Sequence, residues 1–77
     1  MTTEVKLAQF GMGMTEGTPV RWLKKEGDRV HEGESIVEIE SSKAVEEIAA
    51  PISGVLTKIL ASEGETVPVY SVIALID

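Results

Sequence analysis

Lys43 is the residue whose type and setting most clearly allow chemistry in this chain, and it stands between Ser42 and Ala44. The segments on either side have the composition of strands, so residues 41–44 are expected to form a tight hairpin turn with Lys43 at its exposed tip. A lysine amine on a flexible stem forms a stable amide, and a rigid hairpin presents that amine to a modifying enzyme. Because a lone exposed lysine is usually only a solvated charge, a role for Lys43 depends on the elements around it.

The other reactive side chains form no catalytic or metal-binding set. The chain has no cysteine, which excludes disulfides, a cysteine nucleophile and thiolate metal sites, so any sulfur redox chemistry would have to arrive on a cofactor. His31 is the single histidine and is expected to be a solvated turn residue, so we predict no metal site. Glu38 and Glu40 on one side of the hairpin and Glu46 and Glu47 on the other could do acid–base work, but acidic residues that alternate along an exposed strand face are typically solvated. We therefore predict a chain that is not itself an enzyme.

A glycine-rich segment runs from Phe10 to Glu16, ahead of a strand-like stretch. Its Gly11-x-Gly13 pattern lacks the third glycine and the following helix of a dinucleotide-binding fingerprint, so we interpret it as a surface loop. Met12 and Met14 are then either adaptable contacts for a partner or fillers of gaps in the fold.

The chain consists of two copies of one unit, related by a shift of 37 residues. This shift superposes seven identical residues within the 25 positions from 16 to 40. The identical pairs are Gly17/Gly54, Leu23/Leu60, Glu26/Glu63, Gly27/Gly64, Val30/Val67, Ile36/Ile73 and Ile39/Ile76. We expect Gly27 and Gly64 to adopt positive φ in equivalent turns. Two equivalent halves indicate two sheets related by a pseudo-two-fold axis, which bury together what neither half could bury alone.

Each copy reads as strand, turn, short strand, turn and strand, and no stretch has a convincing helical period. The stretches with the composition of strands are residues 4–9, 18–23, 35–40, 44–49, 55–60 and 71–76. Trp22 and its repeat partner Ile59 are expected in the core or at its edge. The predicted fold class is all-β, either a sandwich or a barrel.

Length and charge restrict the class of protein further. A chain of 77 residues is expected to be one domain, residues 1–77. Its formal net charge of −6 disfavours nucleic acid and anionic membranes as partners, and suits a partner with a basic face. No apolar run approaches the ~20 residues that cross a bilayer, and residues 1–4 have the features of neither a signal nor a transit peptide.

Short motifs follow one another along nearly the whole chain at residues 14–18, 20–23, 25–28, 32–34, 40–44, 50–54 and 63–68, which read MTEGT, VRWL, KEGD, EGE, ESSKA, APISG and EGETVP. This ordered set resembles the biotinyl/lipoyl attachment family, and within it the lipoyl domains of 2-oxo acid dehydrogenase acyltransferases. The resemblance implies a flattened barrel or sandwich of two four-stranded antiparallel sheets. It also implies that Lys43 lies on the turn between the fourth and fifth strands.

The same resemblance implies a lipoyl group attached covalently to Lys43, with Ser42 and Ala44 completing the hairpin. Biotinyl members usually flank their lysine with methionine, so the neighbours here favour lipoate. Lipoyl domains commonly have aspartate before the lysine, whereas this chain has Ser42, a difference that bears more on recognition by a decarboxylase than on lipoylation. The implied recognition surface for partner enzymes comprises Phe10, Gly11, Met12, Gly13, Met14 and Glu40.

The implied activity is that of a substrate-carrying domain. A lipoate ligase or lipoyl transferase would load it, and its disulfide would accept an acyl group and two electrons from a thiamine-dependent 2-oxo acid decarboxylase. An acyltransferase catalytic domain would take the acyl group, and dihydrolipoamide dehydrogenase would reoxidise the dithiol. We expect the domain itself to be monomeric. We expect a cytoplasmic location in a bacterium or archaeon, or the mitochondrial matrix in a eukaryote.

Two alternatives remain at this point. One is a biotin carrier domain of a carboxylase, which the missing methionine pair around Lys43 disfavours. The other is an unmodified β-barrel binding module, which the Lys43 hairpin and the glycine-rich loop disfavour.

Overall fold

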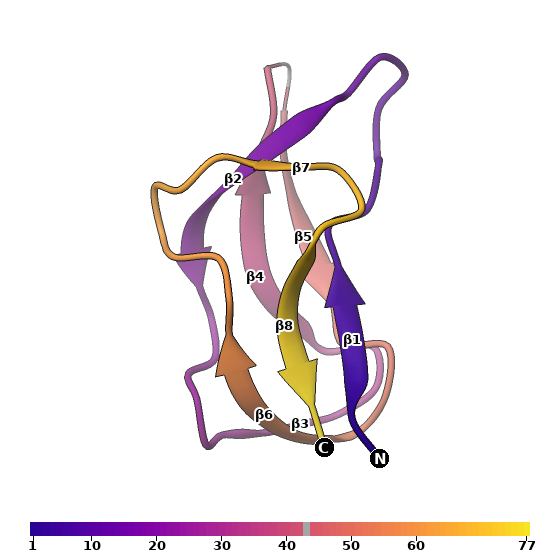
Figure 1. Ribbon diagram of the computed structural model, residues 1–77, viewed down its shortest axis with the longest axis vertical. Coiled ribbons are helices and arrows are strands. Elements are labelled where there is room, and N and C mark those ends of the chain that lie inside the picture. Colours follow the sequence, from indigo (N-terminus) through magenta and orange to yellow (C-terminus); the bar gives the residue numbers. More distant parts are fainter. Residues whose placement is uncertain (43) are drawn as a thin grey trace.

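The computed structural model describes residues 1–42 and 44–77, and these contain eight strands and no helix. The strands are β1 (Thr3–Lys6), β2 (Glu16–Trp22), β3 (Arg29–Val30), β4 (Ser35–Glu40), β5 (Val45–Ala49), β6 (Gly54–Ile59), β7 (Val67–Pro68) and β8 (Val72–Ile76). They form two four-stranded sheets that face each other, with β1, β8 and β6 nearer the viewer in Figure 1 and β4 and β5 behind them. In the described part of the chain, no helix is long and apolar enough to span a membrane.

The two sheets have the same internal order, β1-β8-β6-β3 in one and β5-β4-β2-β7 in the other. Strands β1, β2, β3 and β4 of the first half therefore correspond to β5, β6, β7 and β8 of the second half. This correspondence confirms the predicted pseudo-two-fold symmetry. Each sheet takes strands from both halves, because β3 pairs with β6 and β7 pairs with β2. No pairing among the described strands joins the two sheets, so the fold is a flattened sandwich and not a closed barrel.

The repeated glycines lie in equivalent turns. Gly27 and Gly64 have φ values of 95° and 86°, as the repeat predicted. The Gly27 N–H donates to the Leu56 carbonyl over 2.7 Å, and the Gly64 N–H donates to the Pro19 carbonyl over 2.8 Å. Each turn thus fastens one half of the chain to a strand of the other half.

The glutamates that precede these glycines also connect the two halves of the chain, through hydrogen bonds of their side chains. Glu26 Oε2 accepts a hydrogen bond from the Ile59 N–H over 2.8 Å, and Glu63 Oε2 accepts one from the Trp22 N–H over 2.9 Å. The indole of Trp22 also donates to the Ala61 carbonyl over 2.9 Å. The identity of Glu26 and Glu63 in the repeat therefore has a structural cause, since both carboxylates satisfy backbone groups at the end of a strand.

The core lies between the sheets and is almost entirely aliphatic. Its largest fully buried side chains are Leu7, Pro19, Val30, Ile36, Val37, Ile39, Leu56, Ile73 and Ile76. Repeat partners such as Ile36 and Ile73 are buried alike, as the symmetry requires. Trp22 and Ile59 pack against the edge of this core, as predicted.

The observed strands differ from the predicted ranges in small ways. β1 ends at Lys6 instead of residue 9, and the short strands β3 and β7 have only two residues each. In β4 the pairing register with β5 shifts between Ser35 and Val37, so that Ile36 and Val37 are both buried. Such an irregularity breaks strict inward–outward alternation and is not visible in an alternating sequence pattern.

The molecule measures 32 × 20 × 17 Å. Figure 1 shows the β4–β5 hairpin and the loop of residues 7–15 at one end of the long axis, and both chain termini at the other. At the terminal end Thr3 pairs with Ile76, and Thr2 Oγ1 donates to Asp77 Oδ1 over 2.6 Å. The site predicted from the sequence and the ends of the chain therefore lie at opposite poles.

Candidate functional site

The hairpin that joins β4 to β5 has a well-paired stem. Glu40 lies opposite Val45 in the register, and the Ser41 N–H donates to the Ala44 carbonyl over 2.8 Å. Ser41 Oγ donates to the same carbonyl over 3.2 Å. The tight hairpin is thus confirmed at its stem, whereas Lys43, with its predicted exposure, lies outside the described residues.

The loop of residues 7–15 closes on itself through backbone and side-chain hydrogen bonds. The Met14 N–H donates to the Gly11 carbonyl over 3.1 Å, and Gly13, at the third position of this turn, has a φ of 79°. A positive φ at that position is what a type II turn requires, and glycine adopts it without strain. Gln9 Nε2 donates to the Met14 carbonyl over 3.0 Å and closes the base of the loop.

The two methionines of this loop lie in different environments. Met12 is 97% exposed, whereas Met14 is 9% exposed and belongs to the core. Phe10 is partly buried and packs against the same core. Met14 therefore fills space in the core, which is one of the two roles considered for these methionines. Of the two, only Met12 presents an exposed apolar side chain to a partner.

The loop and the hairpin form the two walls of a groove of about 250 Å³. The loop contributes the five residues 10–14, and the hairpin contributes Ser41, Ser42 and Ala44. Ser42 and Ala44 are exposed and have small side chains, so the neighbours of Lys43 in the sequence leave room for another molecule. The structure therefore brings together all of the predicted site residues that it describes except Glu40.

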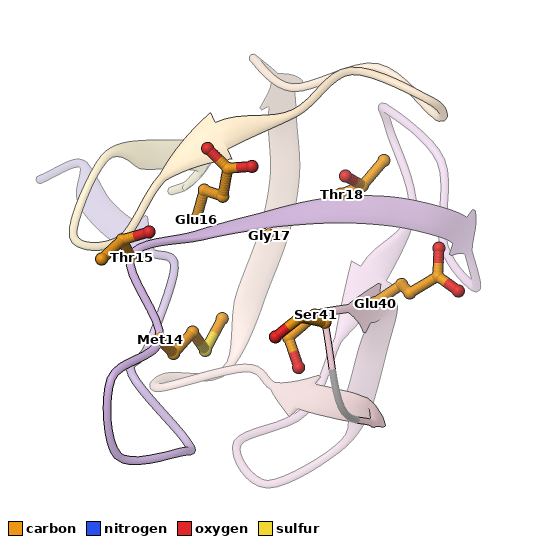
Figure 2. Close-up of a pocket in the computed structure, with 8 residues that line it drawn as sticks. Met14, Thr15, Glu16, Gly17, Thr18, Glu40 and Ser41 are labelled. Carbon is orange, nitrogen blue, oxygen red and sulfur yellow. The ribbon is translucent and has the colours of Figure 1, made fainter.

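Glu40 lines a second groove, of about 290 Å³, on the other side of Ser41 and Ser42. Figure 2 shows this groove between β2 and the hairpin, with Met14 pointing toward Ser41. Its floor contains Gly17, where a Cβ atom would lie 2.8 Å from Ile39 Cγ2. A larger residue at this position would push β2 away from β4, and the groove depends on this close approach.

Carboxylates gather on the outer face of the sheet that carries the hairpin. Glu38 lies opposite Glu47 in the β4–β5 register, an arrangement of like charges that is unfavourable by itself. Arg21 Nε lies 3.6 Å from Glu38 Oε1, and Ser35 Oγ donates to Glu47 Oε1 over 2.6 Å. With Glu40 exposed at the end of β4, this face presents negative charge next to the hairpin.

The single histidine lies in a turn between β3 and β4. The side chain of His31 is 77% exposed, as predicted, and its Nδ1 lies 3.7 Å from Glu34 Oε1. The pKa of Glu34 is lowered chiefly because its carboxylate accepts the His31 N–H, and further because Lys24 Nζ lies 3.0 Å from its other oxygen. Within residues 1–42 and 44–77, no group of three or more histidine and acidic side chains could hold a metal ion.

Sequence reasoning missed part of the lining. Ser41 takes part in both grooves, and Thr15, Glu16, Gly17 and Thr18 line the second one. Gly17 is identical to Gly54 in the repeat, Ser41 belongs to the predicted hairpin turn, and Thr15 and Glu16 belong to the predicted glycine-rich loop, although none of them was named as a site residue. Thr18 becomes a neighbour of the hairpin through the pairing of β2 with β4, which a local pattern does not reveal.

Comparison with known proteins places this geometry among recognised domains. Residues 3–76 match the family of biotinyl and lipoyl attachment domains described as "Biotin-requiring enzyme". The chain is 45% identical, over 95% of its length, to the dihydrolipoyllysine-residue succinyltransferase component of the 2-oxoglutarate dehydrogenase complex of Staphylococcus saprophyticus. It is 48% identical, over 84% of its length, to the dihydrolipoyllysine-residue acetyltransferase component of the pyruvate dehydrogenase complex of Mycobacterium bovis. It spans only 17% and 12% of these two proteins.

A solved structure agrees over almost the whole fold. The solution structure of the lipoyl domain of the 2-oxoglutarate dehydrogenase complex from Azotobacter vinelandii superposes with a TM-score of 0.78. The two sequences are 34% identical, and the superposition covers 96% of this chain and 94% of that domain.

Proposed function

We propose that Lys43 is the attachment site of a lipoyl group, because this chain belongs to the family of biotinyl and lipoyl attachment domains. Its relatives and its structural neighbour identify it as a lipoyl domain of the kind found in acyltransferase components of 2-oxo acid dehydrogenase complexes. A lipoyl domain carries acyl groups and does not transform them by itself.

The observation that supports Lys43 most strongly is the hairpin around it. The bonds from Ser41 to the Ala44 carbonyl fix the stem of the hairpin. Ser42 and Ala44, which flank residue 43 in the sequence, have small and exposed side chains. A lysine in such a setting is accessible to an enzyme that forms an amide on its amine.

The composition of the chain fits lipoate as the carried group. There is no cysteine, so this chain supplies no thiol or disulfide of its own. A bound lipoyl group would supply a disulfide that can take up an acyl group together with two electrons. The chain's own part would be to carry the attachment point on the β4–β5 hairpin and to offer the flanking grooves to partner enzymes.

The partners follow from this proposal. We propose that the chain acts as one domain of a larger acyltransferase component, since it spans about a sixth of its succinyltransferase relative. Its partners would be a lipoate ligase or lipoyl transferase, a thiamine-dependent 2-oxo acid decarboxylase, an acyltransferase catalytic domain and dihydrolipoamide dehydrogenase. Tethering keeps the carried group at high effective concentration near each of these sites.

The cellular location would be that of the complex, in the cytoplasm or the mitochondrial matrix.

The test is the mass of the peptide that contains residue 43, after co-expression with a lipoate ligase and, separately, with a biotin ligase. We expect one lipoyl addition on the wild type and none on Lys43→Arg. Lys58→Arg, which changes an exposed lysine on β6, is the matched control and should be modified like the wild type. The unfolding free energy of Lys43→Arg should stay within about 0.5 kcal/mol of the wild type, as for most exposed substitutions.

The family match leaves one competing cofactor, because the family includes biotinyl domains. A biotin addition at Lys43 in place of the lipoyl addition would assign the chain to the biotin carriers. Absence of both additions would favour an unmodified binding module.

A further inference from the structure

Tyr70 has a backbone conformation that does not suit its residue type. Its φ is 73°, and it is the one non-glycine residue with positive φ in the described part of the chain. It is the third residue of a turn that begins at Pro68 and ends at Ser71, in which the Ser71 N–H donates a hydrogen bond to the Pro68 carbonyl over 3.2 Å. Glycine or asparagine is normally required at that position, and a bulky residue there is strained.

The other half of the chain shows what this position normally holds. The shift of 37 residues places Tyr70 on Gly33, whose φ is 88°. The Tyr70 N–H donates to the Leu7 carbonyl over 2.8 Å, and the Gly33 N–H donates to the Ala50 carbonyl over 2.9 Å. The backbone is therefore the same in both halves, and only the side chain differs.

The side chain of Tyr70 reaches the loop next to the hairpin. Its hydroxyl donates to Gln9 Oε1 over 3.2 Å, while Gln9 Nε2 donates to the Met14 carbonyl over 3.0 Å. The Val69 N–H donates to the Thr15 carbonyl over 3.0 Å, which brings the turn against the same end of the loop. One amide side chain thus connects the strained tyrosine to the base of the groove.

The two halves differ at a second place, and it is this loop. Nine residues separate β1 from β2, whereas four residues separate β5 from β6. The two departures from symmetry, the longer loop and the tyrosine, are therefore in contact with each other through Gln9. A strained residue persists where the surrounding structure holds it, and such residues are concentrated at functional sites.

We infer that Tyr70 is a positioning residue, which fixes the loop of residues 7–15 against the β4–β5 hairpin through Gln9 and so prepares the groove for a partner enzyme. The inference rests on the proposed function, since the partner is the decarboxylase that acylates the lipoyl group. An ordered loop does not have to be ordered again on binding, so its fixation lowers the KM for the domain and leaves kcat unchanged.

The first measurement is amide hydrogen exchange of the unmodified chain, which requires no partner. Tyr70→Phe removes only the hydroxyl, and Gln9→Leu removes both side-chain bonds. Tyr70→Phe should accelerate exchange of the Met14 amide about fivefold, the factor that corresponds to about 1 kcal/mol for one hydrogen bond, and Gln9→Leu should accelerate it at least as much. The double variant should exchange no faster than Gln9→Leu alone, because Tyr70 acts through Gln9. Thr57→Val, which removes a hydroxyl bond to the Leu75 carbonyl, is the control and should leave this amide unchanged.

The second measurement is the acylation of the lipoylated domain by the decarboxylases of a pyruvate and a 2-oxoglutarate dehydrogenase complex, tried in turn. Tyr70→Phe and Gln9→Leu should raise the KM for the domain by a similar factor at constant kcat. Tyr70→Gly should raise the KM as well, yet it should unfold at the same temperature as the wild type or a higher one, because it relieves the backbone strain.

These measurements separate the inference from the proposed function. Unchanged exchange in both single variants would overturn the inference, and so would faster exchange with an unchanged KM. A lower unfolding temperature for Tyr70→Gly would show that the side chain serves the fold, which also overturns it. A wild type that no ligase lipoylates would instead refute the proposed function, while the exchange data still decide whether Tyr70 fixes the loop.

Discussion

Gly17 and Gly54 occupy equivalent places in the two halves, and a side chain at either would meet neighbouring atoms. A Cβ at Gly17 would lie 2.8 Å from Ile39 Cγ2 and 3.2 Å from Met14 Cε. At Gly54 it would lie 2.5 Å from the Asp77 carbonyl oxygen. The repeat thus preserves glycine for lack of space, and not for a positive φ.

Gly17→Ala should destabilise the domain. Ile39 is fully buried and branched at Cβ, so it has little freedom to move away, and overpacking of this kind costs about 1–3 kcal/mol. Denaturant unfolding measures the loss. Gly11→Ala is the matched control, because no atom lies within 4 Å of a Cβ there, and it should stay within about 0.5 kcal/mol of the wild type. Equal stability of both variants would contradict the steric explanation.

Glu34 gives the domain a component of stability that depends on pH. Its pKa is lowered in the folded state, so the stabilisation is present above its ordinary value of 4.5 and is lost as the pH falls through the folded value. Glu34→Gln should therefore lose less stability than the wild type on acidification through this range, as measured by denaturant unfolding at several pH values.

Lys24→Gln tests which contact lowers this pKa most. The bond from the His31 N–H remains in that variant and is the larger cause, so the pKa of Glu34 should rise only partway to its ordinary value. A carboxyl titration followed by NMR measures it. A full return to 4.5 would mean that Lys24, and not the backbone, is the main cause.

Single residues differ in how far the sequence reveals them. The pattern around Lys43 predicted a hairpin, because strand composition on both sides of four residues leaves few other structures. The repeat marked Gly17, although the reason for glycine there emerges only from its distance to Ile39. The repeat aligns Tyr70 with Gly33, but the sequence alone does not reveal its positive φ, since that conformation is set by a turn and by a loop distant in the sequence.

The turns after β2 and β6 hold the two sheets together at the level of elements. Glu63→Ala should remove the acceptor of the Trp22 N–H and cost about 1 kcal/mol, the usual net worth of one hydrogen bond. Glu63→Gln keeps a side-chain oxygen and should lose less. Glu32→Ala, at an exposed position, is the control for loss of a surface charge. If Glu63→Ala and Glu32→Ala unfold at the same denaturant concentration, the hydrogen bond from the Trp22 N–H to Glu63 contributes nothing measurable to stability.

The long strands were predicted well because their composition is local information. Residues 35–40 were predicted as a strand and form β4, and residues 55–60 correspond to β6 within a residue at each end. The partners of β3 and β7 could not be read from the sequence, since two-residue strands exist only through pairing with the opposite half. The register shifts in β2 and β4 have the same origin in long-range packing.

The whole molecule is two interleaved halves with the hairpin at one pole and the chain ends at the other (Figure 1). The symmetry maps the β4–β5 connection onto the gap between β8 and β1, where Thr2 and Asp77 are hydrogen-bonded. A chain that runs β5-β6-β7-β8-β1-β2-β3-β4 therefore has the same topology as the natural order. It keeps every strand pairing of the present structure, and only the covalent connection between β4 and β5 is opened.

A circular permutant should consequently fold. The variant begins at Ala44, ends at Ser42 and joins Asp77 to Thr2 through a four-residue linker, the length that separates Glu40 from Val45 in the natural hairpin. It should show the same β-sheet circular dichroism and a cooperative unfolding transition, because new ends are best tolerated at an exposed, short connection, and Thr2 and Asp77 are already hydrogen-bonded to each other. Without residue 43 it should take up no lipoyl group from the ligase. A permutant that stays unfolded would show that the β4–β5 hairpin is needed to form the fold, and the hairpin would then be a structural element as well as a site of attachment.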